Sequence, residues 1–528
     1  MRYLRFVTSP NGRGTLRSPL LLLACGSTWP MGNSPRTPSI HILDDNSLLR
    51  LFYLYRSLLL GEDDDGDRFK RGMRPWVSES WWYKLAHVCH RWRNLIFGSA
   101  SFLDISFVCT NGTSVADMLA HSPPIPLVID YCEVYGGITA EDEDGAIFAL
   151  TQRHRVRCIR LFMPITNLQK LIVVIEDEYP ILQHLIIWCR VWDDTTVFMF
   201  PDTLHAPHLR QLTLTSFAIP VGCRLLTAAA RLVTLFLVMN SSSTYFHPNT
   251  LLQWLSFMPR LETLMISFLY TVPNPGAEIQ LAHLPVMTPV TLSNLHHFWF
   301  QGHISYMEPL VHYITPCPEK LELDFFHDFS NQSMFSFPPL VRFMSTTDSE
   351  NLKFKCVKFK FSERRVSVVV YPRGEAEKCF LSVIVNGLDF DWQASSVTQI
   401  SNSLGQIFSA AERLTLEFED GEDSWSSDER KVEHNGFDRI QWRRLLSSFS
   451  KAKTLCIDNG FIKGVSRCLE LDDGGPPSEL LPELQELKYS WNGKPGPTGV
   501  AFTSFIDARR NTGRRIILIR YRKRVINR

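Results

Sequence analysis

His87, Cys89 and His90 are the closest grouping of side chains that could bind a metal ion. On a helix, positions 87 and 90 are neighbours while Cys89 lies off their shared face, and no second ligand pair follows at a suitable spacing. His205 and His208 have an i, i+3 spacing but fall in an expected loop. Neither group predicts a metal site, so we expect no bound metal.

Two other stretches resemble ion-binding or phosphate-binding loops but lack the residues that such loops need. Asp63, Asp65 and Asp67 look like the start of a calcium loop, but Arg68 and Arg74 stand where that loop needs Gly and a bidentate Glu. The later run GKPGPTG has neither glycine order known to cradle phosphate. No nucleophile elbow and no zinc-protease motif is present either. We therefore expect no cofactor and no enzymatic activity.

Composition narrows the class of protein and of partner. A chain of 528 residues fits three or four domains, or one small domain and a long repeat array. The formal net charge of +1 gives no reason to expect nucleic acid or an anionic membrane as partner. No apolar run reaches the length of a membrane span. The 12 cysteines contain no CxxC pair, which is typical of free thiols in a reducing compartment, here the cytoplasm or nucleus.

Two helices are expected between residues 38 and 99. The first has leucines and aromatics stepping by three and four through residues 48–59, and Asp44 or Asp45 could cap its start. An acidic loop over 61–67 follows it. The second, one long or broken helix over 81–97, has an unusually aromatic face. That face comprises Trp81, Trp82, Leu85, Val88, Cys89, Trp92, Leu95 and Ile96. Such a module usually buries its apolar surface against a partner.

These apolar positions, followed by FGSASFLDI at 97–105, resemble the F-box of fungal, basidiomycete-like F-box proteins that have a C-terminal leucine-rich-repeat region. The resemblance covers about 65 residues, and its second half is the specific part. It implies a small all-α domain that docks a Skp-family adaptor and so joins a cullin-RING (SCF-type) ubiquitin ligase. By resemblance, we expect adaptor contact from Leu43, Leu48, Leu51, Phe52, Leu85, Val88, Trp92 and Ile96. Some of these must pack the domain's own core, and the sequence does not separate the two sets.

Beyond residue 100 a short L-x-x-L-x-L pattern recurs, often with Pro just ahead. Three clear copies cover 207–214, 259–266 and 482–489, and weaker ones are centred on positions 103, 127, 159, 185, 235, 298 and 321. The mean step from position 103 to position 321 is about 27 residues, within the range of leucine-rich repeats. Alternate apolar residues of each strand would share one core, and a helix or turn, such as 114–121, would cover its other side.

The fold class expected is therefore α/β: a small all-α F-box followed by an irregular leucine-rich-repeat solenoid. The boundaries are a disordered extension over 1–37, the F-box over 38–102, the solenoid over 103–500 (irregular after about residue 325) and a basic C-terminal strand and tail over 501–528. The leucines at 20–23 form too short a run for a signal peptide. The C-terminal arginines either flank a terminal strand as solvated charges or form a nuclear-localisation or acid-binding patch.

The function expected is the recognition of a protein substrate for ubiquitination. Variable strand positions would line the substrate surface: Arg210, Gln211, Thr213, Arg260, Glu262, Thr263 and Met265. The alternative is a leucine-rich-repeat scaffold outside the ubiquitin system, whose F-box-like helices only cap the solenoid. An enzyme with a site on the concave face would need converging ionisable residues that the spacing does not reveal.

Overall fold

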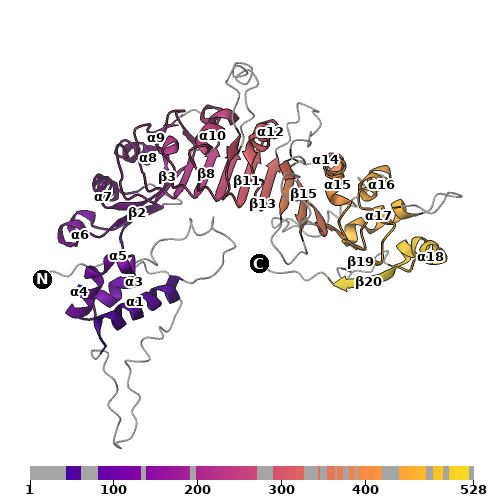
Figure 1. Ribbon diagram of the computed structural model, residues 1–528, viewed down its shortest axis with the longest axis horizontal. Coiled ribbons are helices and arrows are strands. Elements are labelled where there is room, and N and C mark those ends of the chain that lie inside the picture. Colours follow the sequence, from indigo (N-terminus) through magenta and orange to yellow (C-terminus); the bar gives the residue numbers. More distant parts are fainter. Residues whose placement is uncertain are drawn as a thin grey trace, which may run out of the picture. The chain divides into compact units, whose positions relative to one another are not determined.

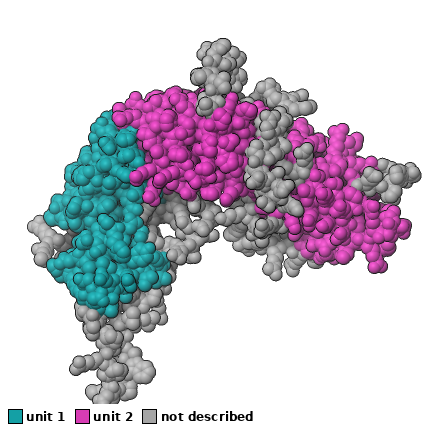
Figure 2. Space-filling view, in the orientation of Figure 1, with its two compact units in different colours: residues 1–191, 204–208 teal, residues 192–203, 209–528 magenta. Residues whose placement is uncertain are grey.

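The protein is an α/β protein with a large, mostly parallel main sheet of 16 strands. The computed structural model describes residues 43–60, 81–132, 138–190, 198–269, 289–325, 340, 343–344, 354–362, 365–372, 380–386, 390–418, 439–470, 480–491 and 499–522. The predicted extension over 1–37, the Asp-rich loop at 61–67 and most of the Gly-rich run lie outside these residues. The chain forms two compact units, unit 1 over 1–191 and 204–208 and unit 2 over 192–203 and 209–528 (Figure 2).

The described part of unit 1 begins with α1 (Asp45–Leu60), α3 (Trp81–Ala86), α4 (His90–Gly98) and α5 (Ala100–Leu103), which we call the helical module. Asp44 caps α1 as predicted, accepting the Ser47 amide at 2.9 Å. The aromatic segment is a broken helix. Cys89 has extended backbone and accepts the amide of Trp92 on its sulfur, so α4 starts afresh there.

The rest of unit 1 alternates strands and helices. Its strands are β1 (Phe107–Cys109), β2 (Leu127–Cys132), β3 (Val156–Pro164) and β4 (His184–Arg190), which pair in parallel in that order. Its helices are α6 (Val115–His121), α7 (Ala140–Thr151) and α8 (Ile165–Ile172). The predicted helix over 114–121 is therefore confirmed. Helix α7 packs on β2 and α8 on β3, so each of these two strands is covered by the helix that follows it in the chain.

Unit 2 continues the pattern over a longer stretch. Its main-sheet strands are β6 (Gln211–Thr215), β8 (Thr234–Met239), β9 (Thr263–Phe268), β11 (His297–Gly302), β13 (Lys320–Phe325), β14 (Cys356–Phe361), β15 (Arg365–Tyr371), β16 (Leu381–Asn386), β17 (Arg413–Phe418), β18 (Thr454–Ile457), β19 (Glu486–Trp491) and β20 (Ile517–Arg522). They lie in the order β6-β8-β9-β11-β13-β16-β15-β14-β17-β18-β19-β20. Strand β15 runs antiparallel to both of its neighbours, whereas the other pairings between these described strands are parallel.

The remaining elements among the described residues of unit 2 are short strands and the connecting helices. The short strands form two parallel pairs, β5 (Phe198–Met199) with β7 (Phe217–Ala218) and β10 (Val290–Thr291) with β12 (Ile314–Thr315). The helices are α9 (Arg224–Thr227), η4 (Ser242–Thr244), α10 (Pro248–Leu255), α12 (Ile304–Tyr313), α14 (Phe390–Ser403), α15 (Gly405–Phe408), α16 (Arg439–Ser447), η5 (Asn459–Phe461), α17 (Ile462–Leu469), η6 (Gly499–Phe502) and α18 (Thr503–Asn511). Helices α9, α10 and α12 lie on one side of their strands (Figure 1).

Alternate strand residues form a continuous core row, as the sequence pattern predicts. The row across β6, β8, β9, β11 and β13 is in register and has no exposed surface; it consists of Leu212, Leu235, Leu264, Phe298 and Leu321. Each such side chain stabilises the fold by about 1.5–3 kcal/mol relative to an exposed one. The repeated leucines therefore hold neighbouring strands in one register.

Two details depart from the repeat prediction. Leu103 is not in a strand: it ends α5, and the first strand begins at Phe107. The pair β15 and β16 was not anticipated, because their Val-rich alternation lacks the L-x-x-L-x-L order.

The predicted C-terminal strand is confirmed as β20. Of the basic residues near it, Arg509 is buried and donates to the carbonyls of Leu480 and Leu481, so it is not one of the solvated charges.

Candidate functional site

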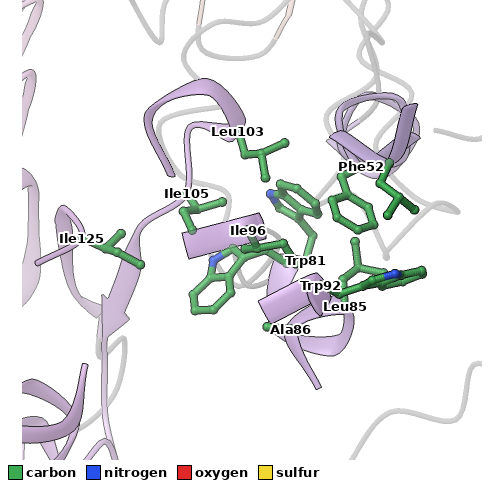
Figure 3. Close-up of a cluster of buried hydrophobic side chains, with 11 residues drawn as sticks. Phe52, Trp81, Leu85, Ala86, Trp92, Ile96, Leu103, Ile105 and Ile125 are labelled. Atoms are coloured by element: carbon green, nitrogen blue, oxygen red, sulfur yellow. The ribbon is translucent and has the colours of Figure 1, made fainter. Parts of the chain in front are cut away.

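The helical module has a core of its own, built mainly from aromatic and leucine side chains. Phe52 of α1 meets Trp92 of α4 edge to face, with ring centroids 4.9 Å apart. Ile96 and Leu48 are fully buried in the same cluster. Figure 3 shows Phe52, Trp92 and Ile96 converging between the helices. The aromatic face of 81–97 is therefore largely used inside the chain.

The structure divides the eight residues predicted to contact an adaptor. Five are buried in the core of the module, namely Leu48, Phe52, Leu85, Trp92 and Ile96. Leu51 is half-buried against that core. Leu43 is partly exposed, and Val88, in the turn between α3 and α4, has 56% of its surface exposed. Only these last three can reach a partner without unfolding the module.

An exposed apolar stripe runs along α1 beside the buried face. It consists of the exposed Leu54 and Leu58, and the half-buried Leu51 continues it one turn earlier, at spacings of i, i+3 and i+7. Leu54 and Leu58 have 61% and 81% of their surface exposed. The helical periodicity of the sequence includes Leu58 but not Leu54. Position on the helix, and not residue type, separates Leu54 from the buried Leu48.

The start of α1 is fixed to α4 by a charged side chain. The guanidinium of Arg91 donates to the Asp45 carboxylate at 2.7 Å and to the Leu43 carbonyl at 2.7 Å. Hydrogen bonds from the backbone and hydroxyl of Ser47 lower the pKa of Asp44. These contacts hold Leu43 near the point where α1 begins and α4 passes.

The module is also joined to the strands that follow it. Trp82 donates its indole N–H to the carbonyl of Ser106 at 3.2 Å and packs edge to face on Phe107 of β1. Asp104, in a left-handed conformation after α5, accepts hydrogen bonds from Arg56 of α1 and Arg157 of β3. Helical module and first strands thus share one hydrophobic and polar junction.

A second candidate surface lies at the start of the unit 2 strands, where the substrate surface was predicted. Thr213 and Thr263 are buried. Gln211 and Met265 are half-buried. The remaining three residues of the predicted set, Arg210, Arg260 and Glu262, line one pocket together with Arg231, Val233 and Asn294.

This pocket has a volume of about 400 Å³ and lies where successive turns enter β6, β8 and β9. Arg231, Arg260 and Asn294 each precede the first leucine of a repeat copy, at Leu232, Leu261 and Leu295. Alignment of the weaker copies on the clear ones would have pointed to Arg231 and Asn294. Repetition in the sequence thus places like positions side by side in space.

On β11 and β13 a charged cluster lies near the same ends of the strands. His297 contacts the Glu322 carboxylate at 3.0 Å and Lys320 contacts it at 2.9 Å. Burial alone would raise the pKa of Glu322, but hydrogen bonds from His297 and Lys320 outweigh it and lower the pKa to about 2. The negative charge of Glu322 is therefore balanced by side chains of the same cluster.

Metal sites, reactive cysteines and membrane-spanning helices have little support in the described part of the chain. No three or more His, Cys, Asp or Glu side chains gather there closely enough to hold a metal ion. Burial raises the pKa of the Cys109 and Cys468 thiols to about 12, so both stay protonated and weakly nucleophilic at neutral pH. Among the described helices, none combines the length and apolar character needed to cross a bilayer.

Comparison with known proteins adds no family. The chain matches no protein-family model, and no curated protein matches its sequence.

Proposed function

We propose that this protein is the substrate-recognition subunit of an SCF-type ubiquitin ligase. In this proposal the helical module is an F-box that docks a Skp-family adaptor, and the strands beyond it form a leucine-rich-repeat solenoid that holds a protein substrate. The cullin-RING ligase would then be recruited through the adaptor. No catalytic group is required of this chain.

One observation carries the proposal: the helical module has a complete core and, in addition, a row of exposed leucines. A surface helix of a globular domain typically has polar or charged residues on the face opposite its core. On α1, by contrast, Leu54 and Leu58 expose 61% and 81% of their surface one helical turn apart. Exposed apolar surface of this kind is typical of a site that a partner covers.

The strand region supports the second half of the proposal. Its parallel strands follow one another with short helices between them, and like positions repeat along the sheet. Arrays of this type present extended surfaces for protein recognition. The ligase would gain its rate from proximity, because a tethered substrate lysine meets the charged conjugating enzyme at high effective concentration.

The test is co-purification of the full chain with a Skp-family adaptor. The variant Leu54→Ser/Leu58→Ser removes exposed leucines, whereas Leu48→Ala or Trp92→Ala would damage the core of the module and lose binding indirectly. Val173→Ser, at an exposed position of the same unit, is the matched control. We expect the wild type and the control to capture the adaptor and the double variant to lose it. Absence of capture by the wild type would refute the proposal.

The second candidate is a leucine-rich-repeat scaffold whose helices cap the first strands. The contacts of Trp82 with Ser106 and Phe107 favour this function, since a cap must pack on the strand beside it. A helix that serves only as a cap does not require the exposed apolar stripe on α1. Adaptor binding discriminates, because the scaffold would capture none and would be unchanged by Leu54→Ser/Leu58→Ser.

A further inference from the structure

The pocket at the start of β6, β8 and β9 has a charge imbalance that points to a ligand. Three of its six lining residues are arginines, Arg210, Arg231 and Arg260, and Glu262 is the one acidic residue among them. Arg231 and Glu262 interact with other groups of the protein. By contrast, neither Arg210 nor Arg260 has a hydrogen bond or ion pair from its side chain to any residue that the structure describes.

Backbone hydrogen bonds join the neighbouring turns that carry these side chains. The amide of Val233 donates to the carbonyl of Arg210 at 2.8 Å, and that of Glu262 donates to the carbonyl of Val233 at 2.8 Å. The same link continues from His296 to Glu262 at 2.9 Å. Adjacent strands lie about 4.8 Å apart, so the backbones of the three turns lie within about 10 Å of one another.

Asn294, another residue that lines the pocket, is also hydrogen-bonded to a neighbouring turn. Asn294 donates its side-chain amide to the carbonyl of Pro259 at 3.0 Å, which ties the turn before β11 to the residue preceding Arg260. Because the turns are joined by these hydrogen bonds, ligand binding has mainly the arginine side chains to order.

We propose that this pocket binds an anionic group on an acidic segment of the recognised protein. A guanidinium presents paired N–H donors that fit the oxygens of a carboxylate or a phosphate, and arginines on neighbouring strands can share one anion or take two successive ones. Val233 offers a small apolar contact beside them. The proposal rests on the proposed function in that it gives the substrate class of the strand surface.

The test measures binding of short peptides to the full chain by fluorescence anisotropy. The probes are a fluorescein-labelled dodecapeptide with three consecutive glutamates among Gly and Ser, the same peptide with three glutamines, and one with three phosphoserines. We expect the glutamine peptide to bind at least tenfold more weakly than an acidic one. The carboxylate and phosphoserine probes together decide which anion is preferred.

The variants locate the site. Arg210→Gln/Arg260→Gln should weaken binding of the acidic peptide at least tenfold, and Glu262→Gln should strengthen it about twofold to threefold because it removes the acidic lining residue. Arg444→Gln, at an exposed arginine on α16, is the control and should change nothing. Raising the salt from 50 mM to 200 mM should weaken wild-type binding, since it screens exposed charges.

Three results would overturn the proposal: equal binding of the glutamine and acidic peptides, wild-type affinity in the double variant, or no binding of either acidic peptide at millimolar concentration. Adaptor capture by the same proteins is measured in parallel. Failure of the wild type to capture the adaptor would count against the proposed function alone, whereas intact capture with any of the three results would count against the pocket alone.

Discussion

The buried ion pair between Asp130 on β2 and Arg160 on β3 gives a quantitative prediction about unit 1. The two groups form paired hydrogen bonds of 2.7 and 2.8 Å, and their side chains are only 7% and 5% exposed. For opposite charges about 4 Å apart at an effective dielectric of about 20, the Coulomb attraction is about 4 kcal/mol. Asp130→Asn leaves the Arg160 charge buried without its counter-charge, for which losses of about 3–5 kcal/mol are typical. We therefore expect Asp130→Asn to lower the free energy of unfolding by about 4 kcal/mol.

The control for this prediction removes both charges at once. Asp130→Val/Arg160→Met places apolar side chains in a row that already includes Ile186 of β4. Because replacing a buried pair by apolar residues of similar size is often neutral, we expect the double variant to lie within about 1 kcal/mol of the wild type. The assay is urea unfolding followed by tryptophan fluorescence. The reasoning is refuted if Asp130→Asn loses less than about 1 kcal/mol, or if the double variant is as unstable as the single one.

Two further predictions concern unit 2. Glu322 has a folded-state pKa of about 2, below the ordinary value of 4.5, so its contribution to stability is present above pH 4.5 and is lost as the pH falls toward 2. The wild type should exceed Glu322→Gln in urea midpoint at pH 7 and lose that advantage by pH 2–3; a constant difference would contradict this. Gly464→Ala should destabilise by about 1–3 kcal/mol, because its Cβ would lie 2.7 Å from the buried Trp442 indole nitrogen, while Gly405→Ala, with nothing within 4 Å, should not. Equal thermal unfolding midpoints for Gly464→Ala and Gly405→Ala would contradict the second of these predictions.

Much of the strand layout could be predicted from the leucine pattern, since it depends on which residues are buried. The core row from Leu212 to Leu321 repeats a spacing that leaves few alternative registers. The pairing of β15 and β16 could not be predicted in this way. A Val-rich alternation predicts a strand, but it does not show which neighbour the strand pairs with or in which direction. Strand order there depends on long-range packing that spacing does not encode.

The candidate sites show the same limit at the level of single residues. Leu48 and Leu54 are the same residue type on one helix, and only the packing of α4 against α1 makes the first a core residue and the second a surface one. The break at Cys89 likewise turns Val88 out to the surface, although uninterrupted periodicity would place it on the buried face. At the strand ends, Arg210 and Arg260 were among the predicted residues, while the third arginine lay in a weaker copy of the repeat.

The measurement that tests the central claim most directly is a calorimetric titration of the full chain with a purified Skp-family adaptor. Leu54 and Leu58 would each contribute about 1.5–3 kcal/mol if a partner buried them fully, and about 1.4 kcal/mol corresponds to a tenfold change in Kd. We predict that the wild type and Val173→Ser bind with one adaptor per chain, and that Leu54→Ser/Leu58→Ser binds at least tenfold more weakly while it unfolds at the wild-type temperature. No heat of binding with the wild type, or equal affinity in the stripe variant, would contradict the account.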